Sequence, residues 1–364
     1  MSMPAEQPTQ QLTYAQAIRQ GLEQAMERDS RVILIGEGVP DPKAIFGTTA
    51  GLREKFGSDR VFDMPLSENG MTGICIGAAL NGMRPVMVHQ RIDFALLAMD
   101  QLVNNAAKWH YMFDGKARIP MVVRVIVGRG WGQGPQHSQS LQSMFGHVPG
   151  LKVVMPSTPY DAKGMLISAI DDDNPVIFIE HRWLHHISDA VPAPEYRVQL
   201  GQPRVLHHGT RMTIAGYSYA VLEALHVARK LSAFGVDVEV IDMRTVRPMD
   251  ETMLFESVRK TGKLMVVDTG WPSCGMASEL IARVALREFA SLKRAPVRVT
   301  LPDHPAPTSP HMTDGYYPTE KTIFEGVMEM LDNPLNSSDR ELLIAAIQRD
   351  GPADVPQRSF AGPF

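Results

Sequence analysis

The sequence has little cysteine and no long apolar run. Cys75 and Cys274 are the only cysteines among 364 residues, too few for a disulfide framework, and both lie among small or apolar residues. We therefore interpret them as packing residues in a reducing compartment. No apolar stretch approaches the roughly 20 residues of a membrane span, and the first eight residues lack the pattern of a signal peptide. These absences predict a cytoplasmic protein that does not associate with membranes.

The sequence also lacks a strong excess of one charge and several familiar motifs. The net charge is -4 and no long basic stripe occurs, so nucleic acid is not an expected partner. No Walker loop and no Gly-x-Ser-x-Gly elbow occur. The run Gly-Arg-Gly-Trp-Gly-Gln-Gly at 128–134 resembles a dinucleotide fingerprint, but Pro135 and His137 follow where the packed helix should begin. These absences disfavour nucleic-acid binding, P-loop chemistry, serine hydrolysis and nicotinamide binding.

What the sequence does contain is a regular alternation of apolar strands and helical segments. The composition, 44% hydrophobic and 21% charged, is ordinary for a globular protein, and 364 residues exceed the usual size of one hydrophobic core. Strands apolar on both faces indicate parallel sheets, so we predict an α/β fold of two domains, each a largely parallel sheet flanked by helices. The predicted parts are a flexible lead before residue 12, a first domain over 12–188, a linker over 189–204, a second domain over 205–332 and a tail over 333–364. Thr13 and Gln16 form a capping-box pattern, one helix is expected over Phe94–Met112, and the tail is expected to contain a short helix.

Within the first domain, Glu68 is the most informative single residue. It follows the short apolar run Val61-Phe62-Asp63-Met64 and precedes the segment of small residues Ile74–Leu80, which we expect to be a tightly packed helix. Open α/β sheets bind ligands where a strand ends and a helix begins, so a cofactor could meet this carboxylate. An acid in the first helical turn also stabilises the helix dipole without any catalytic role. The local sequence leaves both interpretations open.

Two further residues are predicted to share an edge with Glu68. Phe94 follows the strand Arg84–His89, and His137 follows the strand Met121–Val127 through a loop with four glycines. In a parallel sheet all three would lie along the carboxyl edge of the strands. A carboxylate, an aromatic ring and a histidine on one edge form a plausible catalytic set.

The histidines His181, His185 and His186 raise the question of a metal site. Two of them lie four residues apart, but the segment ends a strand and has no partner carboxylate at helical spacing. We therefore expect solvated or interface histidines rather than metal ligands.

Several motifs in fixed order resemble one known family. They include Leu12-Thr13-Tyr14-Ala15-Gln16-Ala17-Ile18, Leu34-Ile35-Gly36-Glu37-Gly38, Ser67-Glu68-Asn69-Gly70-Met71-Thr72-Gly73, Met99-Asp100-Gln101-Leu102-Val103-Asn104, Gln136-His137-Ser138-Gln139 and Gly150-Leu151-Lys152-Val153-Val154-Met155-Pro156. Over residues 12–332 the chain resembles the beta subunit of thiamine diphosphate-dependent 2-oxo acid dehydrogenases. That family joins a transketolase-like pyrimidine-binding domain to a transketolase C-terminal domain. The resemblance implies oxidative decarboxylation of a 2-oxo acid, with acyl transfer to lipoamide.

The resemblance also assigns residues. Glu68 matches the glutamate that hydrogen-bonds the aminopyrimidine ring of the cofactor, Phe94 the aromatic residue on the face of that ring, and Gln90 lies beside it. His137 matches the histidine that assists proton transfers and guides the acyl group to the lipoyl group of the next enzyme.

A further correspondence concerns a cation. Ala169, Asp172 and Asn174 match a segment that holds potassium in some relatives, and their oxygen atoms suit a hard cation.

One family motif is missing. No Gly-Asp-Gly run with a downstream Asn, which binds the diphosphate and Mg²⁺, occurs in this sequence. The resemblance therefore implies that an alpha subunit supplies that half of the site, in an alpha2beta2 heterotetramer that also meets a lipoyl-bearing acyltransferase. Two alternatives are the C-terminal half of a split transketolase or deoxyxylulose-phosphate-synthase-like enzyme, and a non-catalytic assembly subunit.

Two departures from the family leave the substrate open. The loop with Arg129, Trp131 and Gln133 is bulkier than usual, and the stretch His181–His186 is more basic. Pyruvate, branched-chain 2-oxo acids and acetoin all remain candidates, as does a specialised acyl donor.

Overall fold

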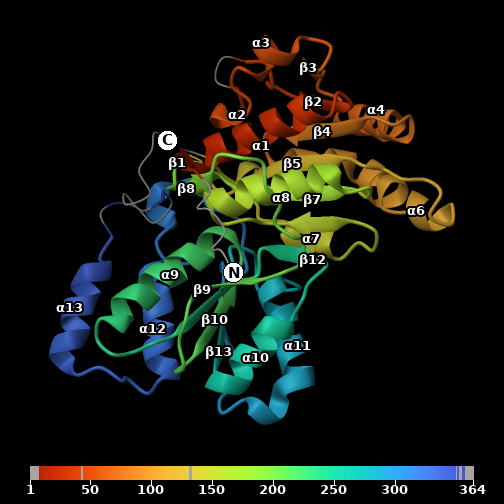
Figure 1. Ribbon diagram of the computed structural model, residues 1–364. Coiled ribbons are helices and arrows are strands. Elements are labelled where there is room, and N and C mark those ends of the chain that lie inside the picture. Colours follow the sequence, from red (N-terminus) through yellow and green to blue (C-terminus); the bar gives the residue numbers. More distant parts are fainter. Residues whose placement is uncertain (1–7, 42–43, 131–132, 350, 352–354, 357–364) are drawn as a thin grey trace, which may run out of the picture. The chain divides into compact units, whose positions relative to one another are not determined.

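The computed structural model describes residues 8–41, 44–130, 133–349, 351 and 355–356, and these form two compact units (Figure 1). Within the described residues, the first unit runs to Val127 and resumes over Met144–Leu200. The second unit comprises Gly128–Ser143 and the chain from Gly201 onward. Among these residues, no helix is long and apolar enough to cross a bilayer.

A parallel sheet forms the centre of the first unit. Its strands lie in the order β6-β7-β5-β4-β2-β3 and every pairing among them is parallel. The apolar runs that predicted buried strands are buried, because helices cover both faces. The bounds are β2 Val32–Gly36, β3 Val61–Phe62, β4 Arg84–His89, β5 Val122–Val127, β6 Lys152–Val154 and β7 Val176–His181.

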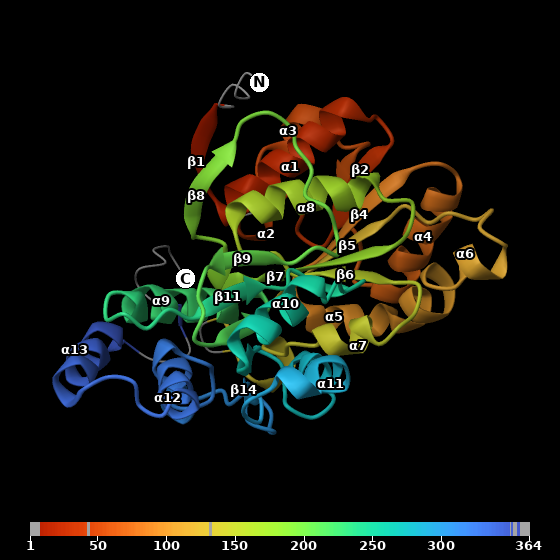
Figure 2. The same cartoon turned by 60° about the horizontal axis from the view of Figure 1, so that its bottom comes forward.

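Helix α1 shows how local sequence places the first element. Thr13 and Gln16 form the predicted capping box, and Ile18, Leu22 and Met26 then form the buried face that packs near α8 (Figure 2). The helical segments of this unit are α1 Tyr14–Arg28, α2 Ala44–Gly47, α3 Leu52–Phe56, α4 Glu68–Leu80, α5 Ile92–Ala95, η1 Leu96–Ala98, η2 Gln101–Ala106, α6 Trp109–Met112, α8 Pro159–Asp171 and η4 Arg182–Leu184. The segment η3 Pro135–His137 lies within the stretch 128–143 that groups with the second unit, and α7 Gln142–Gly146 spans the boundary between Ser143 and Met144.

Three expectations about the first unit need correction. The predicted flexible lead and the predicted linker each contain a strand, β1 Thr9–Thr13 and β8 Ser188–Pro192, which pair antiparallel (Figure 2). Neither was visible in sequence, because each strand gains its hydrogen bonds from a segment far away in the chain. The single helix expected over Phe94–Met112 is instead four short segments, including the π-helix η2. Such π-turns occur frequently at functional sites.

A second, mostly parallel sheet forms the core of the second unit. Its order is β14-β13-β10-β11-β9, with β9 antiparallel at one edge. Figure 1 shows α9 and α12 on one side of this sheet and α10 and α11 on the other. The bounds are β9 Arg204–His207, β10 Thr213–Gly216, α9 Ser218–Ser232, β11 Glu239–Asp242, β12 Thr245–Arg247, α10 Thr252–Thr261, β13 Leu264–Val267, α11 Met276–Glu288, η5 Phe289–Ser291, β14 Val297–Val299, η6 Pro310–Met312, α12 Glu320–Met330 and α13 Ser337–Ile347. Helix α13 lies in the predicted tail, where a short helix was expected; the end of that tail is outside the described residues.

Candidate active site

Glu68 is the first residue of α4, directly after the turn that follows β3. Only 9% of it is exposed. The preceding residue, Ser67, makes no side-chain capping bond, while Thr72 Oγ1 donates to the Glu68 carbonyl at 2.7 Å. The acid at this helix start is therefore buried at the carboxyl end of the sheet, as an acid that serves a ligand should be.

A second carboxyl group, that of Glu37, lies beside Glu68. Burial is the largest cause of a raised pKa of Glu37, followed by the charge of Glu68 and a hydrogen bond to it. The neighbouring charge of Glu68 therefore favours the protonated form of Glu37. Position 36, directly before Glu37, requires glycine, because a Cβ there would lie 2.3 Å from the Val88 carbonyl oxygen. Sequence reasoning did not select Glu37, although an acid directly after the buried strand β2 is the same signal that selected Glu68.

Gln90 joins this pair and Phe94 follows it. Gln90 Nε2 donates to the Glu37 carbonyl at 3.2 Å. Phe94 is half-buried on α5, the short helix that begins two residues after Gln90. Of the predicted set, Glu68 and Gln90 are thus both next to Glu37, which was not predicted. Phe94 lies on the short helix that follows Gln90.

This group of side chains fits an aminopyrimidine ring. A carboxyl group that shares a proton can donate a hydrogen bond to a ring nitrogen, and an aromatic side chain offers a flat face for stacking. The pairing of half-buried Glu37 with buried Glu68 is the observation that carries the fit, since two adjacent acids without a ligand gain little from their proximity.

His137 belongs to the second unit, so its predicted proximity to Glu68 stays a prediction. It ends η3, its backbone N–H donates to the Gly134 carbonyl at 3.2 Å, and its side chain is partly exposed. Of the bulky loop residues noted in the sequence, Arg129 is buried, Gln133 is half-buried and Trp131 lies outside the described residues.

Of the solvated and interface interpretations, the solvated one is wrong for His181, the last residue of β7, and for His185. His181 and His185 are 2% and 0% exposed. His185 Nε2 lies 3.2 Å from Glu180 Oε2, and Arg124 donates twice to the same carboxylate, at 2.6 and 2.9 Å. Within the described part of the chain, no group of three or more His, Cys, Asp or Glu could hold a metal ion. The imidazole of His185 therefore faces a buried acid, and burial lowers the pKa of this histidine.

The predicted potassium segment lies at the turn between α8 and β7. Asp172 Oδ1 accepts from the backbone and side-chain N–H groups of Asn174 at 2.9 and 3.1 Å, and Lys152 donates to Asp172 Oδ2. Arg84 donates to the carbonyls of Ile170 and Asp172. A potassium ion here would compete with Lys152 for the carboxylate, and the potassium site stays a prediction.

The two cysteines differ. Cys75 is buried, and burial raises the pKa of its thiol to about 12, which fits a packing residue. Cys274 is exposed, contrary to the packing role expected for it.

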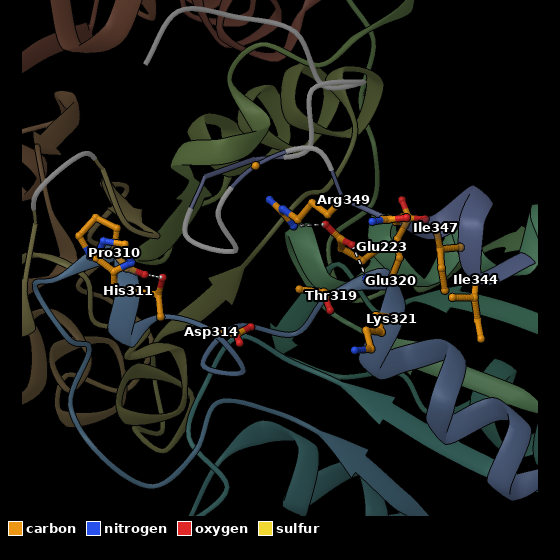
Figure 3. Close-up of a pocket in the computed structure, with 13 residues that line it drawn as sticks. Glu223, Pro310, His311, Asp314, Thr319, Glu320, Lys321, Ile344, Ile347 and Arg349 are labelled. Carbon is orange, nitrogen blue, oxygen red and sulfur yellow. Dashed lines mark hydrogen bonds and ion pairs between the residues drawn. The ribbon is translucent and has the colours of Figure 1, made fainter. Parts of the chain in front are cut away.

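A cavity of about 710 Å³ lies in the second unit, among α9, α12 and the end of α13 (Figure 3). None of the predicted site residues lines it. Glu223 and Arg349 face each other there at 3.7 Å, and the Glu223 carboxylate also accepts from the Glu320 backbone at 2.7 Å. These contacts fasten the last described helix to α9 and α12.

Comparison with known proteins places both halves of the chain. The profile of the transketolase pyrimidine-binding domain matches residues 10–186, and that of the transketolase C-terminal domain matches residues 201–323. A solved structure, a split-gene transketolase described as an inactive beta4 tetramer, superposes with a TM-score of 0.70 at 20% identity and covers 89% of this chain and 99% of its own. That likeness concerns the fold.

Curated relatives are similar over most of their length. The beta subunit of acetoin:2,6-dichlorophenolindophenol oxidoreductase from Cupriavidus necator is 43% identical over 317 residues, covering 84% of this chain and 94% of the relative. Its Bacillus subtilis counterpart is 38% identical, covering 89% and 98%. The mitochondrial pyruvate dehydrogenase E1 component subunit beta of Rattus norvegicus is 38% identical, covering 88% and 91%.

Proposed function

This chain belongs to the family of transketolase-like beta subunits that includes pyruvate dehydrogenase E1 subunit beta, and from that membership we propose its function. We propose that it is the beta subunit of a thiamine diphosphate-dependent enzyme that oxidatively decarboxylates a 2-oxo acid, or cleaves acetoin, and transfers the acyl group to lipoamide. The observation that carries this proposal is the pairing of half-buried Glu37 with buried Glu68 at the carboxyl edge of the first sheet.

The chain's own residues have distinct tasks in this proposal. Thiamine diphosphate supplies the carbanion chemistry when bound. Glu68 holds a proton at its carboxyl group toward the pyrimidine ring, and Glu37 shares that proton. Gln90 braces Glu37 through its carbonyl, and Phe94 offers the aromatic face. His137 exchanges protons with the substrate and directs the acyl group to the lipoyl arm.

The rest of the active site comes from another chain in this proposal. The sequence has no Gly-Asp-Gly motif for the diphosphate and Mg²⁺, so an alpha subunit supplies that half. We further propose an alpha2beta2 assembly that works with a lipoyl-bearing acyltransferase in the cytoplasm. The potassium ion at Ala169, Asp172 and Asn174 belongs to the same proposal.

The split-transketolase alternative has less support. Similarity to the split-gene transketolase is 20% in identity, whereas the acetoin- and pyruvate-type beta subunits reach 43% and 38%. A transketolase half would also need phosphate-binding His and Arg residues in both domains, and no such set was found in the sequence.

The test is to express this chain with and without its alpha subunit. The complex is then assayed for thiamine-dependent reduction of 2,6-dichlorophenolindophenol with pyruvate, a branched-chain 2-oxo acid, acetoin and a ketose phosphate. We expect activity with one of the first three donors and only from the complex. Glu68→Gln should lower kcat by at least about 100-fold, because general acid–base groups contribute factors of this size.

The matched control is Glu54→Gln, which changes an exposed acid on α3 and should leave kcat unchanged. Full activity from this chain alone would refute the two-chain site. Normal activity of Glu68→Gln in the complex would refute the role of Glu68, and activity with the ketose phosphate alone would favour the transketolase alternative.

A further inference from the structure

The loop that carries His137 is fastened to the second unit at both of its ends. Residues 128–143 group with that unit, although the sequence continues on either side into the first. A glycine-rich loop has little conformational preference of its own, so contacts outside the loop must set where His137 lies.

The first attachment is at Arg129 and Gly134. The Arg129 side chain is 1% exposed, and its guanidinium donates to the Pro307 carbonyl and to the Thr308 carbonyl, the latter at 2.5 Å. Five residues later, Gly134 lies so close to Thr308 that a Cβ on Gly134 would be 2.3 Å from Thr308 Oγ1. The backbone N–H of His137 donates a hydrogen bond to the carbonyl of this glycine.

The second attachment is at Gln142, the first residue of α7. Gln142 is 1% exposed and its Nε2 donates to Asp268 Oδ1 at 2.8 Å. Asp268 is fully buried directly after β13, and its backbone N–H donates to the Val299 carbonyl of β14. Gln142 Oε1 and Asp268 Oδ2 have no hydrogen-bond partner within the described residues. The Asp268 carboxylate also interacts with the backbone of Gly270 and Thr269, and Gln142 contributes the side-chain contact to it.

The two attachments reach neighbouring strands of one sheet. Asp268 directly follows β13, while Pro307 and Thr308 lie on the segment after β14. The ends of the loop are therefore held by a rigid part of the second unit, with His137 between them. Burying charged and amide groups costs free energy unless they are hydrogen-bonded, and these contacts supply the hydrogen bonds.

We propose that Arg129, Gln142 and Asp268 are positioning residues that set the presentation of His137, so that the second domain controls acyl transfer. This inference rests on the proposed function for the role of His137. It assigns to Asp268 and Gln142 a task that neither the family motifs nor the sequence patterns had indicated. The residues act through His137 and need not touch substrate.

The test compares two rates in the complex with the alpha subunit and thiamine diphosphate. One is dye reduction, which does not need the lipoyl group, and the other is acylation of a lipoyl domain. We expect Gln142→Ala and Asp268→Ala to slow lipoyl acylation by about tenfold or more, because small misplacements of a catalytic group have effects of this order. The Kd for thiamine diphosphate should stay within about twofold, since Glu68, Gln90 and Phe94 are on the other unit.

Three further variants sharpen the test. Asp268→Asn keeps an acceptor for the Gln142 amide and should retain most of the acylation rate. Gln202→Ala removes an exposed glutamine of the same unit and should have no effect. In a His137→Ala background, Gln142→Ala should lower the acylation rate by less than a further factor of about two. The effects of two residues are not additive when one acts through the other.

A steric pair covers the case in which the polar variants fold poorly. Gly134→Ala should disturb the loop against Thr308, and adding Thr308→Ala should restore the acylation rate by removing the Oγ1 atom. The proposal would be overturned if Gln142→Ala slowed acylation as much in the His137→Ala background as in the native chain. It would also be overturned if adding Thr308→Ala to Gly134→Ala did not restore the acylation rate.

A readout independent of catalysis separates this inference from the proposed function. The imidazole NMR signal of His137 is identified by its disappearance in His137→Ala. It should shift in Gln142→Ala and stay in place in Gln202→Ala. An unchanged His137 signal overturns the positioning role even if the enzyme is active, and a shifted signal supports it even if none of the tested substrates reacts.

Discussion

At the scale of single residues, burial decides which titratable groups can carry charge. His89 ends β4 on the edge that also holds Gln90, is 1% exposed, and neither ring nitrogen has a partner within the described residues. Burial lowers the pKa of His89 to about 4. The unfolded chain binds a proton on this histidine below about pH 6.5, while the folded chain does not until about pH 4. Stability is therefore lost as the pH falls through this window.

We predict that His89→Leu stabilises the protein, most clearly in mild acid. Removing an unpaired buried polar group should raise the free energy of unfolding by about 1 kcal/mol at pH 7. At pH 4.5 the gain should grow toward about 3 kcal/mol, since the linked proton uptake of the unfolded state disappears. Denaturant unfolding at both pH values measures this, with His147→Leu, an exposed histidine, as the control. Equal effects of the two variants at both pH values would contradict the prediction.

At the scale of elements, buried ion pairs fasten neighbouring segments. Arg124 on β5 and Glu180 on β7 are both 0% exposed and form a bidentate pair, to which His185 after β7 is added. At the opposite end of β7, Lys152 and Arg84 hold the turn that contains Asp172. The first cluster is closed to solvent, whereas the second is partly open and is where a cation could exchange.

We predict that potassium, if it binds at the turn, competes with Lys152. The midpoint of thermal unfolding should then be higher in potassium chloride than in sodium chloride at equal ionic strength by a few degrees. The difference should increase in Lys152→Met, which frees Asp172 Oδ2, and vanish in Asp172→Ala. No difference between the two salts in either the native chain or Lys152→Met would remove the potassium site.

At the scale of the whole molecule, exposed apolar side chains mark where other chains should bind. Leu66 and Ile74, at α4, and Leu97, in η1 beside it, are 84%, 60% and 63% exposed. Grouped apolar side chains of this kind indicate a protein–protein interface. Leu66 lies two residues before Glu68 in the chain, so in the proposed assembly this is the surface that the alpha subunit would cover.

We predict that two copies of this 40.3 kDa chain assemble with two alpha subunits. Ile74→Asp should prevent assembly, because an uncompensated charge would be buried at the interface. Leu342→Asp, on α13 and 60% exposed, should not. Light scattering after size-exclusion chromatography measures the mass. A full-size complex with Ile74→Asp would show that α4 is not at the interface.

The sequence by itself determined the alternation of strands and helices, because burial of apolar runs and capping of helix ends are local matters. The α1 capping box, the β4 bounds and the helix that begins at Glu68 are examples. The motifs and their order along the sequence also determine the family. They also singled out Glu68, Gln90, Phe94 and His137, whose roles stay predictions.

Only the tertiary structure decided what depends on partners remote in sequence. The β1–β8 pairing, the pairing of Arg124 with Glu180 and the contact of Gln142 with Asp268 all join segments that no local pattern relates. The pKa of Glu37 is raised mainly by burial and further by the charge of Glu68, and both causes depend on the folded chain. Local sequence fixes which segments form strands and helices, but the energy of a buried charge is set by its neighbours, and these are known only once the chain has folded.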